Sequence, residues 1–188
     1  MMYGRDGVAK TTQGFKVTPT SYVKLEAAAV DLRKLLPVMN TKSPFHLDAG
    51  RILEQTLPRA GYNYRSGDAT KLGDCAAFTI PEHGLVVLRE DVFDGLESEN
   101  VFSRSTVIHE LAHIVLNHAV TLQRGGTVGE HRFFEDSEWQ AKAFTAALMM
   151  PIEAAKLAKT AAALAALCGT SVQAATYRLD RLKKDKLI

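Results

Sequence analysis

The sequence His109-Glu110-Leu111-Ala112-His113 constrains this chain more than any other feature, because it lies in an apolar segment that predicts a helix over 103–118. Residues four apart share one helical face, so both imidazoles can reach one metal ion. Glu110 lies about 100° around the helix, close enough to act on a water at that ion. The helix is apolar nearly all round, as expected of a buried central element, through Val107, Ile108, Leu111, Ala112, Ile114, Val115 and Leu116.

An alternative interpretation needs no metal: the two histidines bond backbone carbonyls and Glu110 faces solvent. The motif argues against it, since this spacing is typical of zinc hydrolases and buried ionisable groups need compensation. A catalytic zinc also needs a third protein ligand. His118 is a poor candidate, because it lies nine positions after His109 and therefore about 180° around a continuous helix. We expect it to interact with free carbonyls at the helix end.

The rest of the chain predicts an α+β fold. Short β-prone runs at 62–65, 76–80 and 85–89 indicate a small, mostly antiparallel sheet, with 76–80 as its exposed edge. The other predicted elements are helices over 20–36, 43–58 and 137–150, a loop with Gly125, Gly126 and Gly129, and two helices after Ile152 broken at 169–171.

Composition limits the function classes. A net charge of +2 with 23% charged residues gives no field that favours nucleic acid over the whole surface. The two cysteines, Cys75 and Cys168, match no metal or redox spacing and suit a reducing cytoplasm. We expect no secretory signal and no membrane span, because no apolar run is long enough.

A second motif follows the first. Glu138-Trp139-Gln140-Ala141 continues to Phe144 and then to Leu148-Met149-Met150-Pro151. Together with the 109–113 motif it resembles the ImmA/IrrE family of metallopeptidases, over roughly residues 20–185. Ala112 stands where the family usually has glycine, and Thr145 where alanine is common, but neither is at a ligand position.

The resemblance implies a compact zincin-like domain in which the sheet packs on the central 109–113 helix. It also implies His109, His113 and Glu138 as ligands of Zn²⁺, with Mn²⁺ or another divalent ion as an alternative, and Glu110 as catalytic base. The reaction expected is hydrolysis of a peptide bond by water, with Glu110 carrying the proton to the leaving amine.

The residues around Glu138 leave other ligands open. A capping box of Ser137 and Gln140 would place Glu138 in the first turn of its helix and Glu135 outside it, which makes Glu135 the runner-up. Asp136 would point roughly the opposite way, and His131 lies in a loop near glycines. His131 is also a candidate for stabilising the oxyanion, with a surface histidine as the plainer interpretation.

Two further residue patterns have a functional and a plain interpretation. Cys75 could approach the metal as an inhibitory thiolate, but a small buried residue is the simpler reading. The segment 164–182 with its basic end has the look of a helix-turn-helix, but we favour a packing hairpin with a solvated end.

We expect a leader over 1–18, a metallopeptidase core over 19–151 and a C-terminal helical segment over 152–188. By analogy with the family, the substrate is a protein, a helix-turn-helix DNA-binding repressor of a stress-response or mobile-element circuit, and neither nucleic acid nor membrane is a direct partner. The rival function is a catalytically silent zinc-containing interaction or DNA-binding module.

Overall fold

The computed structural model describes residues 14–39, 42–118 and 131–188. The predicted glycine loop at 125–129 lies outside these residues. The elements follow one another as α1 (Tyr22–Arg33), α2 (Ala49–Arg51), a π-helical turn (Ile52–Thr56), α3 (Leu57–Arg59), β1 (Asn63–Gly67), α4 (Ala69–Leu72), β2 (Ala77–Ile80), a 3-10 turn (Pro81–His83), β3 (Leu85–Arg89), α5 (Glu90–Asp94), α6 (Val101–Val115), a 3-10 turn (Phe133–Glu135), α7 (Ser137–Met149), α8 (Ile152–Ala158), α9 (Ala161–Cys168) and α10 (Val172–Lys184).

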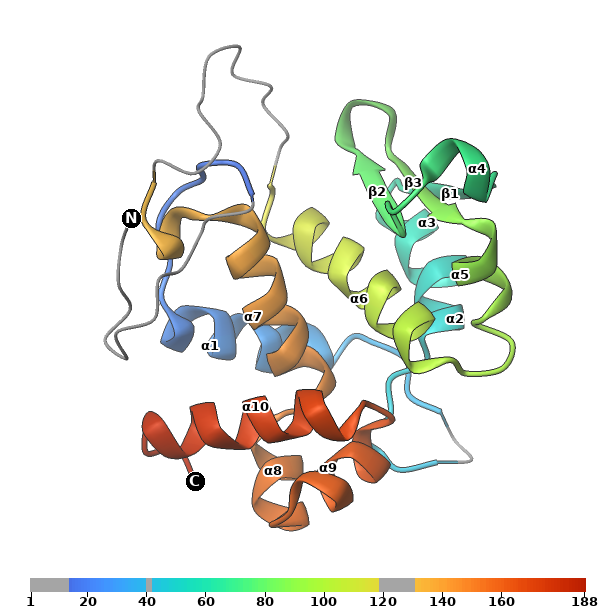
Figure 1. Ribbon diagram of the computed structural model, residues 1–188. Helices are drawn as coiled ribbons and strands as arrows, with labels where there is room; N and C mark the ends of the chain where they lie inside the picture. Colours follow the sequence, from blue (N-terminus) through green and yellow to red (C-terminus); the bar gives the residue numbers. More distant parts are fainter. Residues whose placement is uncertain (1–13, 40–41, 119–130) are drawn as a thin grey trace.

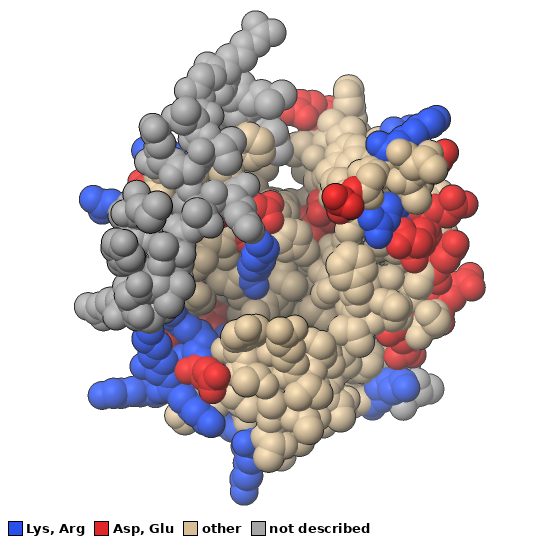
Figure 2. All heavy atoms as spheres, viewed as in Figure 1, with Lys and Arg blue, Asp and Glu red and all other residues tan. Residues whose placement is uncertain are grey.

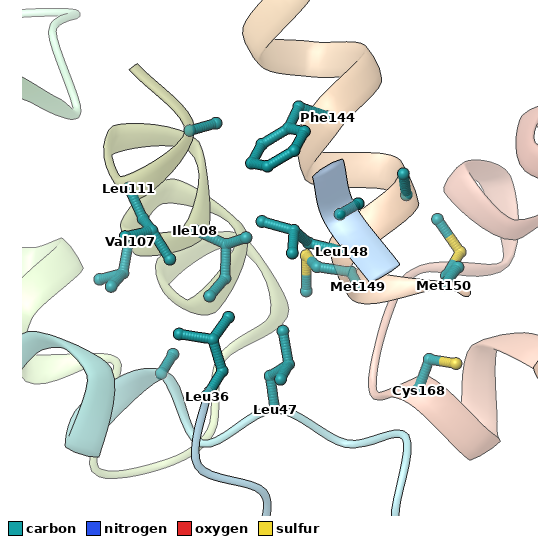
Figure 3. Close-up of a cluster of buried hydrophobic side chains, with 14 of the residues drawn as sticks. Leu36, Leu47, Val107, Ile108, Leu111, Phe144, Leu148, Met149, Met150 and Cys168 are labelled. Carbon is teal, nitrogen blue, oxygen red and sulfur yellow. The ribbon is translucent and has the colours of Figure 1, made fainter. Parts of the chain in front are cut away.

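Helices α6 and α7 lie side by side at the centre of the molecule (Figure 1). The Asn100 side chain begins α6 by accepting hydrogen bonds from the amides of its first turn. The facing surfaces are fully buried at Ile108 and Ala112 on α6 and at Ala141 and Phe144 on α7. Small residues at 112 and 141 allow the two helices to approach closely. Apolar side chains from α1, α9 and the chain before α2 complete this core (Figure 3).

The three strands predicted from the sequence form one sheet in the order β1-β3-β2. The α+β class is therefore confirmed, but the pairing differs in part from the expected one. β2 pairs antiparallel with β3, whereas β1 pairs parallel with it, so the sheet is mixed. β2 intervenes in sequence between β1 and β3 but lies on the other side of β3, where it forms an edge of the sheet beside α6.

The helix expected over 43–58 begins later than predicted. Asp48, not Ser43, caps α2, and the Ser43 hydroxyl instead donates to the Leu167 carbonyl. Pro58 does not end the helix, which continues to Arg59. A π-helical turn precedes Pro58, and in it the Leu57 amide donates to the Ile52 carbonyl. Pro58 comes next and has no amide proton, so it makes no such hydrogen bond itself.

The C-terminal segment contains three helices, α8, α9 and α10, where the sequence predicted two. The additional break comes at Lys159, which adopts a left-handed conformation after α8. The predicted break at 169–171 is present: Gly169 has a φ of 63°, and an added Cβ there would lie 2.1 Å from His46. Only glycine fits that turn.

Residues 14–20, here called the N-terminal strap, pack along the start of α7. The Phe15 carbonyl accepts from the Ser137 amide at 3.0 Å, and the Val17 amide donates to the Glu135 carbonyl at 2.7 Å. This segment includes the end of the expected leader over 1–18, whose first thirteen residues lie outside the described part. Within the described ranges, no helix is both long and apolar enough to cross a bilayer.

Candidate metal centre

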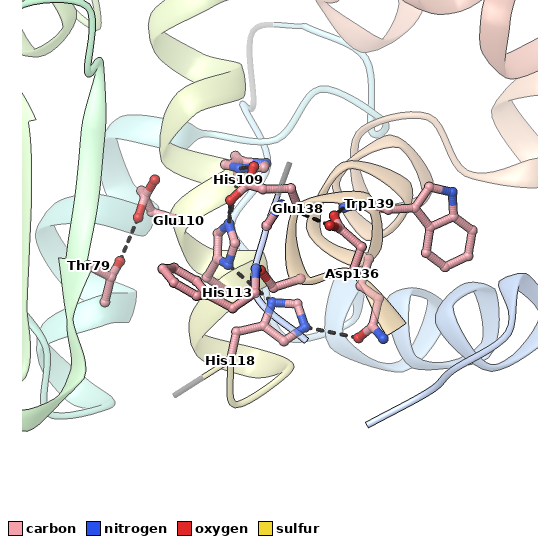
Figure 4. Close-up of polar contacts among 12 residues, drawn as sticks. Thr79, His109, Glu110, His113, His118, Asp136, Glu138 and Trp139 are labelled. Carbon is pink, nitrogen blue, oxygen red and sulfur yellow. Dashed lines mark hydrogen bonds and ion pairs between the residues drawn. The ribbon is translucent and has the colours of Figure 1, made fainter. Parts of the chain in front are cut away.

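Three side chains from the two central helices converge on one point. The Nε2 atoms of His109 and His113 lie 3.1 Å apart. The Glu138 carboxylate, in the first turn of α7, lies 3.3 Å from His109 Nε2 and 3.1 Å from His113 Nε2 (Figure 4). The structure thus brings together the three residues that the resemblance implied as ligands.

The donor set fits a divalent cation. Two imidazole nitrogens and one carboxylate oxygen are a common protein donor set of catalytic zinc, and ligands at about 2.05 Å in a tetrahedral arrangement are about 3.3 Å apart. The observed separations of 3.1 to 3.3 Å match that spacing. One ligand atom from each residue lies within 4.8 Å of the others, and all three residues are only half-buried, which leaves a side open to the cleft.

The charge balance of the cluster also favours a cation. Hydrogen bonds from His109 and His113 hold the pKa of Glu138 well below its usual range, so the carboxylate is charged although burial opposes the charge. α7 can deliver this carboxylate because Asp136 caps the helix by accepting from the Trp139 amide at 2.8 Å. The cap is therefore Asp136 and not the predicted Ser137, whose hydroxyl instead accepts from the Phe15 amide at 3.0 Å.

Glu110 lies beside the cluster and is 6% exposed. The Thr79 hydroxyl on β2 donates to Glu110 Oε2 at 2.7 Å (Figure 4). Sequence reasoning identified Glu110 but missed Thr79, because nothing in the local pattern of a short strand reports which helix residue it faces.

The cluster opens into a cleft of about 650 Å³. The space-filling view shows this face hollowed between the sheet, the two central helices and the start of α10 (Figure 2). Most of the lining is apolar and includes Phe15, Phe78, Phe102, Met149 and Met150. The cleft passes β2, the strand predicted as the exposed edge.

The structure corrects the expectation for His118. It follows the last turn of α6, and its ring, 6% exposed, contacts side chains instead of free carbonyls. Its Nδ1 lies 3.1 Å from His113 Nδ1 and its Nε2 lies 3.0 Å from Gln140 Oε1. Burial lowers the pKa of His118 and so favours its neutral form. Gln140 was missed as a contributor to this site.

The other candidates near α7 lie elsewhere. His131 is buried, and its Nε2 contacts Asp136 Oδ2 at 3.0 Å, so it is neither a surface residue nor among the described residues lining the cleft. Glu135 accepts from the Arg132 amide at 2.9 Å. Cys75 is exposed rather than buried, and its thiol donates to the Ala77 carbonyl.

A buried two-helix centre with a histidine-histidine-glutamate cluster and a glutamate beside an open cleft is the architecture of a metal-dependent hydrolase. Residues 103–180, from α6 into α10, match the Peptidase_M78 family, described as the IrrE N-terminal-like domain. The matched segment carries both motifs, so it confirms the resemblance to the ImmA/IrrE family and supports membership of that family. The family suggests metal-dependent peptidase activity. Comparison with curated proteins by sequence gives no match.

Proposed function

We propose that the protein is a zinc-dependent endopeptidase in which His109, His113 and Glu138 hold the ion and Glu110 is the general base. The observation that carries this proposal is the convergence of the three donor atoms within 4.8 Å beside a buried glutamate and an open cleft. A purely structural zinc site needs no base and is closed by a fourth protein ligand.

When bound, the cation supplies Lewis acidity that polarises the scissile carbonyl and lowers the pKa of water. Thr79 holds one oxygen of the Glu110 carboxylate at 2.7 Å, which leaves the other oxygen to take a proton from the attacking water. Glu110 then delivers that proton to the amine that leaves.

The edge strand β2 supports an extended polypeptide as substrate. Among the described residues β2 pairs with β3 alone, and its residues 77–79 line the cleft beside Glu110. A substrate strand added at this edge would gain main-chain hydrogen bonds while its scissile bond lies at the metal centre. This supports cleavage within a chain rather than at a terminus.

We further propose that the natural substrate is a helix-turn-helix repressor in a reducing cytoplasm, on family analogy. The rival function, a DNA-binding module, finds little support in α10. Among its basic residues, Arg178 is buried and bonded to Glu26, and Arg181 pairs with Asp185 while stacking over Tyr22 at 3.5 Å. Basic side chains do gather beside the C-terminal end of α10 (Figure 2), but these contacts support a packing role.

The test is to incubate the zinc-loaded protein with a helix-turn-helix repressor encoded beside it, with and without a chelator, and to follow the fragments by mass spectrometry. We expect cleavage at one or a few bonds, loss of operator binding, and no cleavage with the chelator or with Glu110→Gln. Elemental analysis should find wild-type zinc in Glu110→Gln, because the substitution removes no ligand. Cleavage by Glu110→Gln at the wild-type rate would contradict the mechanism.

A further inference from the structure

Large apolar side chains are exposed inside the cleft. Among the described residues they are Phe15 in the N-terminal strap, at 43% exposed, and Val101 and Phe102 at the start of α6, at 39% and 54%. A single exposed apolar side chain is ordinary on a protein surface, but several that line one cleft are typical of a binding site for apolar groups. The cleft therefore offers apolar surface that a ligand would cover.

Phe15 and Phe102 lie toward opposite ends of α6. Gln140, early in α7, contacts His118 just past the end of α6, so the start of α7 lies beside the end of α6. The strap is bonded to Ser137 at the start of α7 and therefore lies at that end. Phe102 precedes His109 by seven positions, which is about 10 Å along the helix axis. An extended polypeptide covers that distance with about three residues.

The main chain of Phe15 holds the strap in place. Its amide donates to Ser137 Oγ at 3.0 Å, and its carbonyl accepts from the Ser137 amide at 3.0 Å. The Gly14 amide donates to Asp136 Oδ2 at 2.8 Å. None of these hydrogen bonds uses the phenyl ring. The ring can therefore contact whatever enters the cleft without disturbing the strap.

Phe15 also lies close to the metal centre. A Cβ added at the preceding Gly14 would lie 3.0 Å from Glu138 Cγ. Consecutive Cα atoms are about 3.8 Å apart, so Phe15 is within about two residues of an extended substrate from the point where the three donor atoms converge. A side chain of the substrate next to the scissile bond would therefore meet its ring.

We propose that Phe15 is a specificity-determining residue, whose ring forms one wall of a subsite for a large aliphatic or aromatic side chain next to the scissile bond. The inference rests on the proposed function in taking a polypeptide as the ligand. Phe102 would contact a second side chain, about three residues away on the other side of the bond. The strap is thus part of the surface that selects the substrate.

The first test is a cleavage profile. Short peptides with leucine or serine set at each position in turn are incubated with the zinc-loaded protein, and mass spectrometry gives the bond cleaved and the relative kcat/KM. We expect wild type to favour leucine next to the scissile bond by at least about 10-fold, and Phe15→Ala to reduce that preference to about 2-fold. Phe102→Ala should instead weaken the preference on the other side of the bond. The proposal is overturned if wild type has no apolar preference next to the bond, or if folded Phe15→Ala keeps it.

Two further variants separate a contact with substrate from a structural role. Leu35→Ala removes an apolar side chain that is 79% exposed and outside the described lining of the cleft, so the preference should stay unchanged. Phe15→Lys should favour glutamate at the substrate position where wild type favours leucine. The Tm and zinc affinity of both Phe15 variants should match wild type. A fall in either without a change of preference would make Phe15 a structural residue only and would overturn the proposal.

A binding measurement keeps this inference apart from the proposed function. Fluorescence anisotropy of the same peptides, labelled, with Glu110→Gln gives the ratio of the serine and leucine dissociation constants without cleavage. A ratio of at least about 10 that Phe15→Ala abolishes supports the inference even if wild type cleaves no peptide, in which case the proposed function fails alone. A ratio near one, or one that Phe15→Ala leaves intact, overturns the inference, while cleavage by wild type would still support the proposed function.

Discussion

Gly14 lies where the N-terminal strap crosses the start of α7, and the structure leaves no room there for a side chain. A Cβ added at Gly14 would lie 2.4 Å from Ser137 Oγ and 2.6 Å from the backbone nitrogen of Glu138. It would also lie 3.0 Å from Glu138 Cγ. The hydroxyl can rotate away, but the backbone nitrogen cannot. Gly14→Ala must therefore lift the strap or displace the turn that carries Glu138.

The size of the effect can be estimated from these contacts. Overpacking of this kind costs about 1–3 kcal/mol. For a chain of this length, 1 kcal/mol corresponds to about 2–4 °C in Tm, so the metal-free variant should unfold about 2–12 °C below wild type. Displacement of Glu138 should also weaken zinc binding, since this carboxylate lies within 3.3 Å of both histidines.

Thermal unfolding followed by circular dichroism measures the first effect, and competition against a zinc chelator measures the second. Gly50→Ala is the matched control, because its added Cβ meets only Asp48 Oδ1 at 3.6 Å, an ordinary contact. Alanine is favoured over glycine in a helix, so the control should be as stable as wild type or more so. The reasoning is refuted if Gly14→Ala keeps both the wild-type Tm and the wild-type zinc affinity.

Three further predictions follow from the site and the cysteines. Thr79→Val should lower kcat about 10- to 100-fold, because it loses the hydrogen bond to the Glu110 carboxylate, whereas Thr79→Ser should keep wild-type activity. Both variants should bind zinc as tightly as wild type. Equal kcat values for the two variants in steady-state kinetics would contradict this prediction. Glu138→Ala should lose zinc binding in competition titration and Glu135→Ala should keep it. The reverse result would identify Glu135 as the third ligand. Iodoacetamide should label Cys75 in the native protein but Cys168 only after unfolding, because burial raises the pKa of the Cys168 thiol to about 11; mass spectrometry finding both labelled natively would count against the fold.

The central helices could be predicted well from the sequence because their signals are local. The apolar periodicity and the spacing of His109 and His113 define α6, and the second motif defines α7 to within a residue of its observed end. Two details were wrong: the cap of α7, and the end of α6, which comes at Val115 and not at His118. Asp136 and Ser137 are both good capping residues, and the choice between them depends on the strap, which takes the Ser137 hydroxyl.

The remaining differences come from long-range contacts. β1 pairs parallel with β3 because β2 lies on the far side of β3, and strand order is a tertiary property that short β-prone runs do not carry. His118 was assigned to the helix end because a continuous helix places it opposite His109. In the structure α6 ends at Val115, and Asn117 adopts a positive φ of 50°, which returns His118 toward His113. Neither Thr79 nor Gln140 could be recognised, since each acts across elements distant in sequence.

The most direct test of the account is anomalous diffraction at the zinc absorption edge from crystals of the zinc-loaded protein. We predict one strong peak bonded to His109 Nε2, His113 Nε2 and a Glu138 oxygen, on the side of the cleft that Glu110 faces. A peak bonded to Glu135 or His131, or one closed by a fourth protein ligand, would contradict the proposed catalytic centre.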